Sequence, residues 1–460
     1  MALRLLHRAI WLICAMPVVT HAQFDGDIVF DDSMFDNENL FDAAAEDPDH
    51  FRYRLSHQSV AHINRHRSEN PDGSLTTRSR GLENNRTALN IRYQNPFRDG
   101  WLLQGSAQLR AYLPGDYEYD NPDREDWEWR LNELFVQRSG NRNSYSMGRQ
   151  TIVWGETIGN SVLDVINTTE YRDLTIIDIE DARLNQWMVI WDHFSASGNW
   201  SSFVNLYPEF NPVPVTDSPL FPGAPLRLGY YHRDKPLYEA GTRWNRSFTG
   251  SDVALMVARL YENPLRYTPP ADGNGRAIAH INDYTLAGFS ANRAIGKLLL
   301  TLDIAYSSGV LVDTLTRAPQ ADGSVFVMPT LGEGKLLGVS VGMEYGISAT
   351  QQISMGVRLE KLQDSDIGDA TLADQRADNQ GDLLVRYSNR LMNEELTLSA
   401  TLQAQLDGDA SLLNLSADYR LHDDWELRGQ LIMTRADPLS QLYFLDQDVR
   451  LGITLTWSFQ

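Results

Sequence analysis

The chain has 460 residues, a formal net charge of −21 and 42% hydrophobic residues. An acidic balance of this size argues against nucleic acid as a partner, because proteins that follow a phosphate backbone are basic. The one cysteine, Cys14, lies in the first segment described below. The rest of the chain can therefore form neither disulfides nor thiolate metal sites, and we expect no cofactor.

Residues 1–22 predict a cleavable secretory signal. Arg4 and Arg8 give a positive start, residues 9–19 form a short apolar core, and Ala22 ends a small-residue cleavage site. This order disfavours the alternative, a buried N-terminal helix. No later segment has the unbroken apolar run of about 18 residues that a membrane helix needs. The exported chain is therefore a periplasmic or secreted protein, or a membrane barrel.

Residues 23–50 form an acidic leader with ten acidic residues and no Lys or Arg. Phe-Asp pairs recur in it at intervals of five or six residues. This composition is typical of a flexible, disordered segment, here on the periplasmic side. Alternatively, its phenylalanines dock on a periplasmic or inner-membrane transport partner, or the segment folds into the mouth of a barrel.

From residue 51 onward the chain alternates apolar and polar residues with period two. Residues 101–113 (WLLQGSAQLRAYL) place leucine and alanine on one face and glutamine, serine and Arg110 on the other. Residues 395–406 repeat the pattern with hydroxyl and amide side chains. Such segments of about ten residues are typical of membrane-spanning strands. Strands of soluble β-sandwiches are shorter, about five or six residues on average.

A distinctive motif follows one of these strands, in residues 148–167 (GRQTIVWGETIGNSVLDVIN). This Gly-Arg-Gln…Trp-Gly-Glu run, followed by Asp-Val-Ile-Asn, resembles a proteobacterial family of outer-membrane barrels of unknown function, related in style to the alginate-export-type porins. The resemblance rests on specific residues across about 145–195. Elsewhere it concerns only the general arrangement of strands and loops. It implies a channel of about eighteen strands, linked in some members to envelope transport systems, and it suggests no catalytic residues. Thr168 stands where the family pattern has proline.

Residues 154–184 are predicted to be the third long outer loop and to fold into the barrel. Barrels with sixteen to eighteen strands are wide enough for an aqueous channel, which an inward loop would narrow. Gly155 and Gly159 could bend the chain, while Glu170 and Asp173 could line the opening. The apolar residues of the loop favour this interpretation over an outer flap, which would gain nothing by exposing them. Those apolar residues are Val162, Leu163, Val165 and Ile166.

Arginines dominate the predicted lumen, together with polar residues of the inward loop. Arginine offers anions a planar, permanently charged fork, so an arginine-rich path would favour anionic solutes. Alternatively, the arginines pair with acidic residues of neighbouring strands and stiffen the wall. Arg149 alternates poorly with either face. The predicted lumen and constriction residues are Arg86, Arg92, Arg110, Arg130, Arg149, Trp154, Glu156, Asp164, Asn167, Arg243 and Arg358.

Eighteen candidate strands alternate with short and long connections. Short turns and long loops are expected on the periplasmic and extracellular sides of an outer-membrane barrel, and an even count leaves both termini in the periplasm. The long connections include 67–84, 154–184 and 309–334. The candidate strands lie near 52–66, 85–94, 101–113, 127–138, 144–153, 185–194, 199–207, 237–247, 252–262, 281–292, 297–308, 335–346, 350–362, 381–389, 395–406, 411–421, 424–435 and 445–459.

The last predicted strand, 445–459, alternates apolar residues outward and ends at Phe459, followed by Gln460. It resembles the signal that the barrel-insertion machinery reads, although that signal usually ends on the aromatic residue itself. We therefore predict an all-β, antiparallel transmembrane barrel of about 18 strands (16–18) over residues 51–460. It would contact lipid in the outer membrane of a Gram-negative bacterium.

The leading functional hypothesis is a passive outer-membrane channel for a small or polymeric solute, as part of an envelope transport system. The solute would be anionic if the lumen arginines stay unpaired. One alternative is a barrel enzyme, a lipid hydrolase or protease; eighteen strands and the lack of a recognisable catalytic triad argue against it. Another is an assembly protein whose acidic leader recruits a partner.

Overall fold

The computed structural model of the chain describes residues 50–64, 66–69, 75–78, 80–119, 121, 124–173, 175–176, 182–214, 227–228, 235–268, 276–319, 325–363, 379–406, 410–437, 440 and 442–460. The predicted signal and all but the last residue of the predicted leader lie outside these residues. The description below concerns the unit from residue 46 to residue 460.

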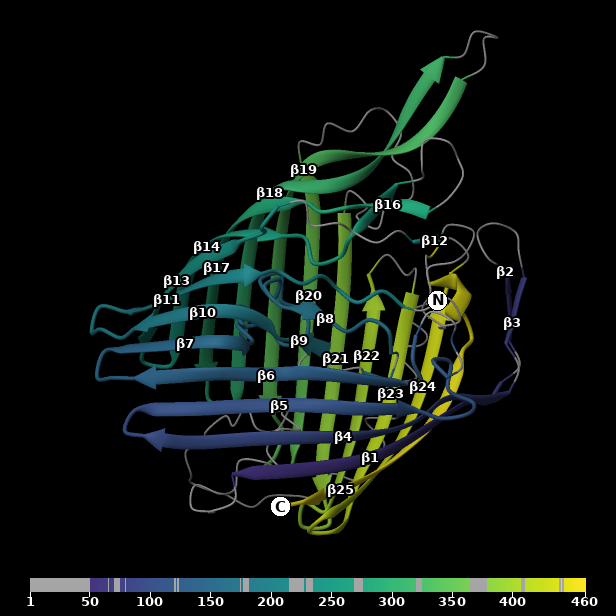
Figure 1. Cartoon of the computed structure of the whole chain (residues 1–460), viewed down its shortest axis with the longest axis horizontal. Helices are drawn as coiled ribbons and strands as arrows, with labels where there is room; N and C mark the ends of the chain where they lie inside the picture. The colour runs from purple at the N-terminus through teal and green to yellow at the C-terminus, as the bar shows by residue number, and fades with distance from the viewer. Residues whose placement is uncertain are drawn as a thin grey trace. The chain divides into compact units, whose positions relative to one another are not determined.

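Among the described residues, eighteen strands form one antiparallel sheet (Figure 1). They are β1 (Phe51–His62), β4 (Gly81–Arg98), β5 (Trp101–Tyr112), β6 (Trp127–Ser139), β7 (Asn143–Gln150), β10 (Gln186–His193), β11 (Asn199–Tyr207), β13 (Glu239–Phe248), β14 (Ser251–Tyr261), β17 (Asp283–Ile295), β18 (Leu298–Pro319), β19 (Val325–Gly346), β20 (Gln351–Gln363), β21 (Asn379–Leu391), β22 (Leu396–Gln405), β23 (Ala410–His422), β24 (Trp425–Ala436) and β25 (Val449–Phe459).

The sheet closes on itself. Strand β1 pairs antiparallel with β4 on one side and with the last strand, β25, on the other. Strand β7 pairs with β10 across the long connection between them. Closure leaves no unpaired strand edge, which is the condition for a sheet to span lipid. The prediction of an all-β antiparallel barrel of about eighteen strands is confirmed.

The connections at one end are short and those at the other end are long. The short turns join β4 to β5, β6 to β7, β13 to β14 and β23 to β24, among others, and both β1 and β25 have their free ends at this edge. The long connections contain short pieces of strand. These are β2 (His66–Glu69), β3 (Leu75–Arg78), β8 (Thr168–Thr169), β9 (Arg183–Leu184), β12 (Arg227–Leu228), β15 (Arg266–Thr268) and β16 (Arg276–His280), and a short 3-10 helix, η3 (Tyr443–Leu445), precedes β25.

One predicted loop is instead mostly strand. Residues 309–334 were expected to be a long outer connection, but β18 and β19 stay paired as far as Pro319 and Val325. The ladder continues past an irregularity between Ser308 and Val310. This run is rich in valine and threonine, which favour extended backbone, and each added residue gains a cross-strand partner.

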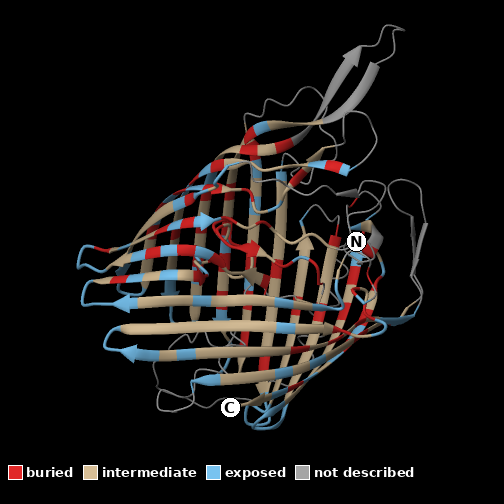
Figure 2. Ribbon diagram, viewed as in Figure 1, coloured by how far each residue is buried: buried red, intermediate tan, exposed pale blue. Residues whose placement is uncertain are grey.

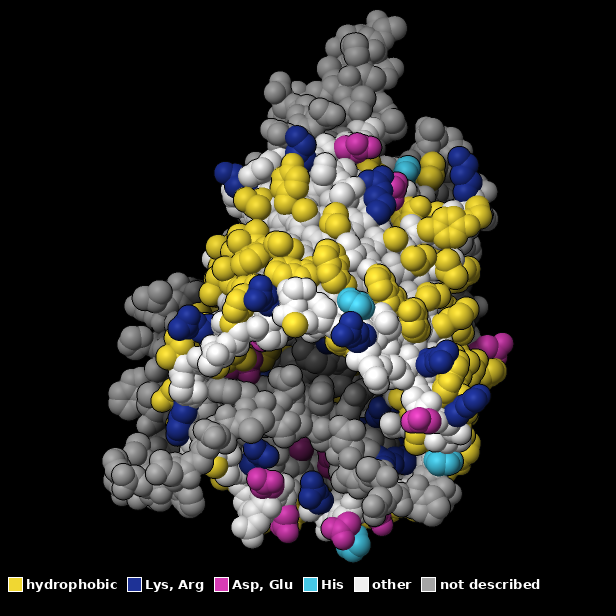
Figure 3. Space-filling view, turned by 90° about the vertical axis from the view of Figure 1, so that its left-hand side faces the viewer, with side chains coloured by type: hydrophobic (Ala, Val, Ile, Leu, Met, Phe, Trp, Pro, Cys, Tyr) yellow, Lys and Arg dark blue, Asp and Glu magenta, His cyan; other side chains and the backbone are white. Residues whose placement is uncertain are grey.

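The outer face of the wall is apolar. On β25 the alternate residues Leu451 and Ile453 are about half exposed, at 48% and 54%, as predicted for lipid-facing positions. Figure 3 shows hydrophobic side chains gathered in a broad band across one face, with most Lys and Arg side chains along its borders. None of the described helices is long and apolar enough to cross a membrane.

The inner face divides into two sectors. In β14 the inward residues Ala254, Met256, Ala258 and Leu260 are apolar and buried. In β22 the inward positions carry only hydroxyl and amide side chains, from Thr397 to Gln405, and most of these residues are only partly buried. Figure 2 shows many of the buried residues on and around the first sector. The segment that covers this sector is the loop with the distinctive sequence motif.

Candidate functional site

The connection between β7 and β10, residues 151–185, is here called L3, and its described residues lie inside the barrel. They bond to inward side chains of β1, β4, β6, β10, β13, β17, β18, β19 and β24. These strands are distributed around the whole ring. One of the contacts, Asp303, is the sixth residue of the 22-residue β18 and so lies well below the rim. A segment that contacts a closed wall from all sides and at this depth must lie within it.

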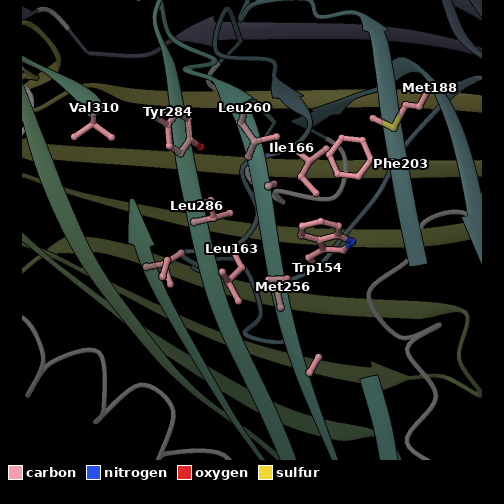
Figure 4. Close-up of a cluster of buried hydrophobic side chains, with 14 of the residues drawn as sticks. Trp154, Leu163, Ile166, Met188, Phe203, Met256, Leu260, Tyr284, Leu286 and Val310 are labelled. Atoms are coloured by element: carbon pink, nitrogen blue, oxygen red, sulfur yellow. The ribbon is translucent and has the colours of Figure 1, made fainter. Parts of the chain in front are cut away.

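The first half of L3 packs on the apolar sector through four buried side chains. Trp154 packs edge-on against Phe203 of β11, with ring centroids 5.3 Å apart. Figure 4 shows Leu163 beside Leu286 and Met256, and Ile166 beside Phe203. The cluster also includes Val162. Complete burial of such a side chain contributes about 1.5–3 kcal/mol, so the packing is the main attachment of this half.

Glycines in the wall make room for this packing. A Cβ atom at Gly241 of β13 would lie 2.6 Å from the Trp154 ring, and one at Gly288 of β17 would lie 2.5 Å from Leu163. At Gly338 of β19 it would lie 2.9 Å from Val162. Real Cβ atoms do not come this close to another atom. A larger residue at any of these three wall positions would therefore push the loop away from the wall.

Two buried polar side chains of the wall hold the backbone of the same half. The Asp303 carboxylate, which is fully buried, accepts hydrogen bonds from the Glu156 and Thr157 backbone N–H groups and from the Ser161 hydroxyl, the last at 2.7 Å. The hydroxyl of Ser340 on β19 accepts from the Val162 N–H and donates to the Asn160 carbonyl. Because the loop has no regular partner strand here, these groups replace the missing ladder bonds.

The chain of L3 passes through Gly155 and Gly159 in a way that leaves no room for a side chain at either position. Gly159 has φ +66°, and a Cβ there would also meet Leu384 of β21 at 2.7 Å. A Cβ at Gly155 would lie 1.9 Å from the Ser161 hydroxyl, which the Asp303 carboxylate holds in place. Both positions therefore require glycine.

Asn167 closes the base of the first half. Its side chain accepts from the Ile152 N–H and donates to the Ile152 carbonyl at 2.7 Å. Asn263, in the connection after β14, donates to the carbonyls of Val165 and Asn167. Asp164 pairs with Arg183 of the same loop at 2.8 Å rather than with the wall.

The second half of L3 reaches the opposite wall and is held there by charge. Asp173 accepts from Arg86 of β4 at 2.8 Å, and Arg86 also makes two bonds to Asp116. Glu170 accepts from Arg130 of β6 at 2.7 Å. Arg172 bridges Glu170 to Glu128, which are on L3 and on β6 respectively.

Burial strengthens this charged contact. Burial alone would raise the pKa of Asp173, but the charge of Arg86 and hydrogen bonds from Thr175 lower it below the ordinary range. Burial would likewise lower the pKa of Arg172, but its bonds to Glu170 and Glu128 raise it. Asp173 and Arg172 are therefore ionised at neutral pH, and their pairs form in a partly dehydrated place where they are screened less than on a surface.

The lumen residues predicted from sequence fall into three groups. Arg86, Arg130 and Arg243 hold L3, the last through Glu156 at 2.8 Å, which Asn292 also contacts. Arg358 lies on the inward face of β20 and pairs with Glu360 at 2.8 Å. Arg92 and Arg110 lie on the inward faces of β4 and β5 and are partly exposed.

Arg149 differs from the lumen position that we predicted. It shares a strand face with Tyr145 and Met147, which are 53% and 60% exposed. Its guanidinium pairs at 2.8 Å with Glu209, in the connection after β11. Its register partners, Leu134 of β6 and Trp187 of β10, are 43% and 37% exposed on the outer face, so Arg149 points away from the lumen.

Asp303 and Ser340 are the main site residues that the sequence reasoning missed. Both bond to residues of L3 that are more than 140 positions away in the chain. One signal was available for Asp303. It is a lone carboxylate at an inward position in the apolar run Leu298–Ala305, where an unpaired charge would be costly.

The closed sheet and its apolar outer face make this a transmembrane barrel. Each strand places apolar residues on the side that faces lipid, and closure satisfies the backbone groups. Barrels of this kind occur in the outer membranes of Gram-negative bacteria, which is where we place this protein.

Comparisons with known proteins find similar solved structures but no sequence relative. No protein-family model matches the sequence, and no curated protein matches it. Acinetobacter baumannii OccAB3 is 11% identical, with a TM-score of 0.49 over 89% of this chain and 98% of that chain. The outer membrane channel DcaP of the same species is 11% identical (TM-score 0.41; 89% and 96% covered). Salmonella typhi OmpF is 8% identical (0.41; 89% and 97%). The barrel assignment itself rests on strand pairing, and the resemblance to alginate-export-type porins stays a prediction.

Proposed function

We propose that this protein is an outer-membrane channel whose aqueous path runs between L3 and the uncovered polar sector of the inner wall. The observation that carries the proposal is the contrast between the two sectors. Where L3 lies on the wall, from β11 to β20, the inward residues are mostly small or apolar. In β22, which no hydrogen bond of the described L3 residues reaches, they are hydroxyls and amides. A wall that faced only protein would have no use for this row of hydrogen-bonding groups.

L3 would then set the width of the path, because it crosses from the apolar sector to the charged residues of β4 and β6. The ion pairs described above use Arg86, Arg130 and Arg243 to hold the loop. Fewer arginines thus remain for a solute than the sequence suggested. Arg110 is partly exposed on the inward face of β5 and lies opposite Glu128 of β6, with which it forms no ion pair, so its guanidinium can still meet a solute.

The proposal assigns no catalytic role to the chain and favours neither direction of transport. A periplasmic or inner-membrane transport partner, bound through residues 23–50, would fit the acidic leader, but nearly all of that segment lies outside the described residues. An anionic solute, small or polymeric, is the solute class that unpaired lumen arginines favour.

Purified protein in planar bilayers should form discrete channels, and Arg110→Gln should lower their chloride-over-potassium permeability ratio. The reason is that Arg110 adds positive charge to the inner wall where water is confined, although Glu128 lies opposite it in the register. Reversal potentials in a salt gradient measure the ratio. Arg149→Gln is the matched control, since Arg149 faces away from the lumen and should leave the ratio unchanged. If the wild-type protein gives no channels, the proposed function is wrong.

Acid should release the charged half of L3. Burial would raise the pKa of Glu170 above its ordinary value of 4.5, but hydrogen bonds from Arg172, with the charges of Arg172 and Arg130, lower it to about 2. A lowered pKa means that Glu170 stabilises docking fully above its ordinary pKa and loses this effect as the pH falls toward about 2. We therefore expect conductance to rise reversibly in this interval. Glu170→Gln should lack the Glu170 step, and an identical acid response of both proteins would show that Glu170 does not hold the loop.

A further inference from the structure

Two arginines face each other on the inner wall near the edge with the short turns. Arg52 of β1 and Arg92 of β4 are direct partners in the strand register. Arg52 shares its strand face with Gln58, which donates to the Thr175 hydroxyl of L3. Arg92 shares its face with Arg86, which also contacts L3. Both side chains therefore point into the lumen, and like charges placed directly opposite each other destabilise a sheet.

A third arginine lies next to this pair. Arg54 is the following inward residue of β1, opposite Asn90 of β4 and Ser458 of β25, which are both uncharged. Neither Arg52 nor Arg54 forms an ion pair with any residue that the structure describes, and both are partly exposed. Arg54 thus has only uncharged side chains opposite it in both neighbouring strands, and Arg52 has Arg92 opposite it in β4.

Charged residues on β23 and β24 are arranged differently. Between β23 and β24, Asp418 is the direct partner of Arg428, and Arg420 is the direct partner of Glu426. Asp418 and Arg428 are also hydrogen-bonded. Opposite charges are thus paired in register there, at the same edge of the barrel. The like-charged arrangement on β1 and β4 is therefore a local feature and does not follow from how the lumen is built in general.

We propose that Arg52 and Arg54, with Arg92 opposite Arg52, form an anion-binding site at the turn-side mouth of the lumen. Its ligand is an oxyanion, a carboxylate or phosphate group of a solute, which accepts bonds from the planar guanidinium forks and removes their mutual repulsion. The proposal rests on the channel function and names the solute class that this mouth admits. Because β1 begins and β25 ends at this edge, the site faces the periplasm.

The site can be tested by block and by direct binding, with citrate and inorganic phosphate as the two probes. Added on the turn side, citrate should block the current at lower concentration than from the other side. The double variant Arg52→Gln/Arg54→Gln should raise the blocking concentration about tenfold or more, since it removes charge-assisted bonds. Arg420→Gln is the matched control. Arg420 lies at the same edge but has Glu426 opposite, so the citrate concentration that blocks the current should be unchanged.

Calorimetric titration of the detergent-solubilised protein gives a readout that does not depend on conduction. Wild type should bind citrate, and the double variant should bind it about tenfold more weakly. Stronger binding of phosphate than of citrate would assign the site to phosphate groups, and the reverse order would assign it to carboxylates. Equal binding by wild type and the double variant would overturn the site even if the protein conducts. Absence of channels with binding intact would instead count against the channel function alone.

Discussion

Deleting residues 158–180 should raise the single-channel conductance several-fold. These residues include most of the packed part of L3 and its charged contacts with β4 and β6. Removing them leaves the eighteen strands and their register in place, because wall pairing does not pass through the loop. Loops of this kind contribute little to the stability of the strands they join. The width of the path would then be set by the wall.

The deletion needs a check on folding, since it uncovers apolar wall residues such as Leu260 and Leu286. A folded barrel should migrate differently on gels with and without boiling, and the deletion variant should keep this difference. Bilayer recordings should show larger but still discrete steps. Unchanged conductance in a folded barrel would mean that the narrowest point lies elsewhere and that L3 only lines the lumen. A smaller, graded increase is expected when single contacts are removed.

The strands could be predicted from the sequence because each one carries its own signal. In residues 395–406 the two faces are set by alternation alone, and the alternation of β25 gave the outward residues in the same way. The ends of the strands were harder to predict. The continuation of β18 and β19 beyond Ser308 depends on pairing between the two chains of one hairpin, which the pattern within either strand does not reveal.

The site was predictable only in part, for a related reason. The apolar residues of L3 indicated packing, but not against which wall, since that depends on how the closed barrel places β11 to β20 around the loop. The partners of Arg86 and Arg130 were expected on neighbouring strands. They include carboxylates of L3, 87 and 40 residues further along the chain. Arg149 was misplaced because only the neighbouring strands show which face of β7 is exposed.

Asp303→Ala should loosen the first half of L3 and give channels that fluctuate among several conductance levels above the wild-type level. The substitution leaves the Glu156 and Thr157 N–H groups and the Ser161 hydroxyl without their acceptor. Each buried donor left unpaired costs about 1–3 kcal/mol. The four buried apolar side chains contribute about 1.5–3 kcal/mol each, so the loop should shift and fluctuate rather than leave the wall.

Open-channel noise and trypsin cleavage within L3 measure this loosening independently. Asp418→Ala is the matched control, because Asp418 is also an inward carboxylate but pairs with Arg428 of the wall. It should change the noise little. Ser340→Ala, which removes one donor and one acceptor from the same half of the loop, should fall between the two. If Asp303→Ala shows the same open-channel noise and trypsin cleavage as wild type, apolar packing alone positions L3. The buried carboxylate would then stabilise the wall and not the loop.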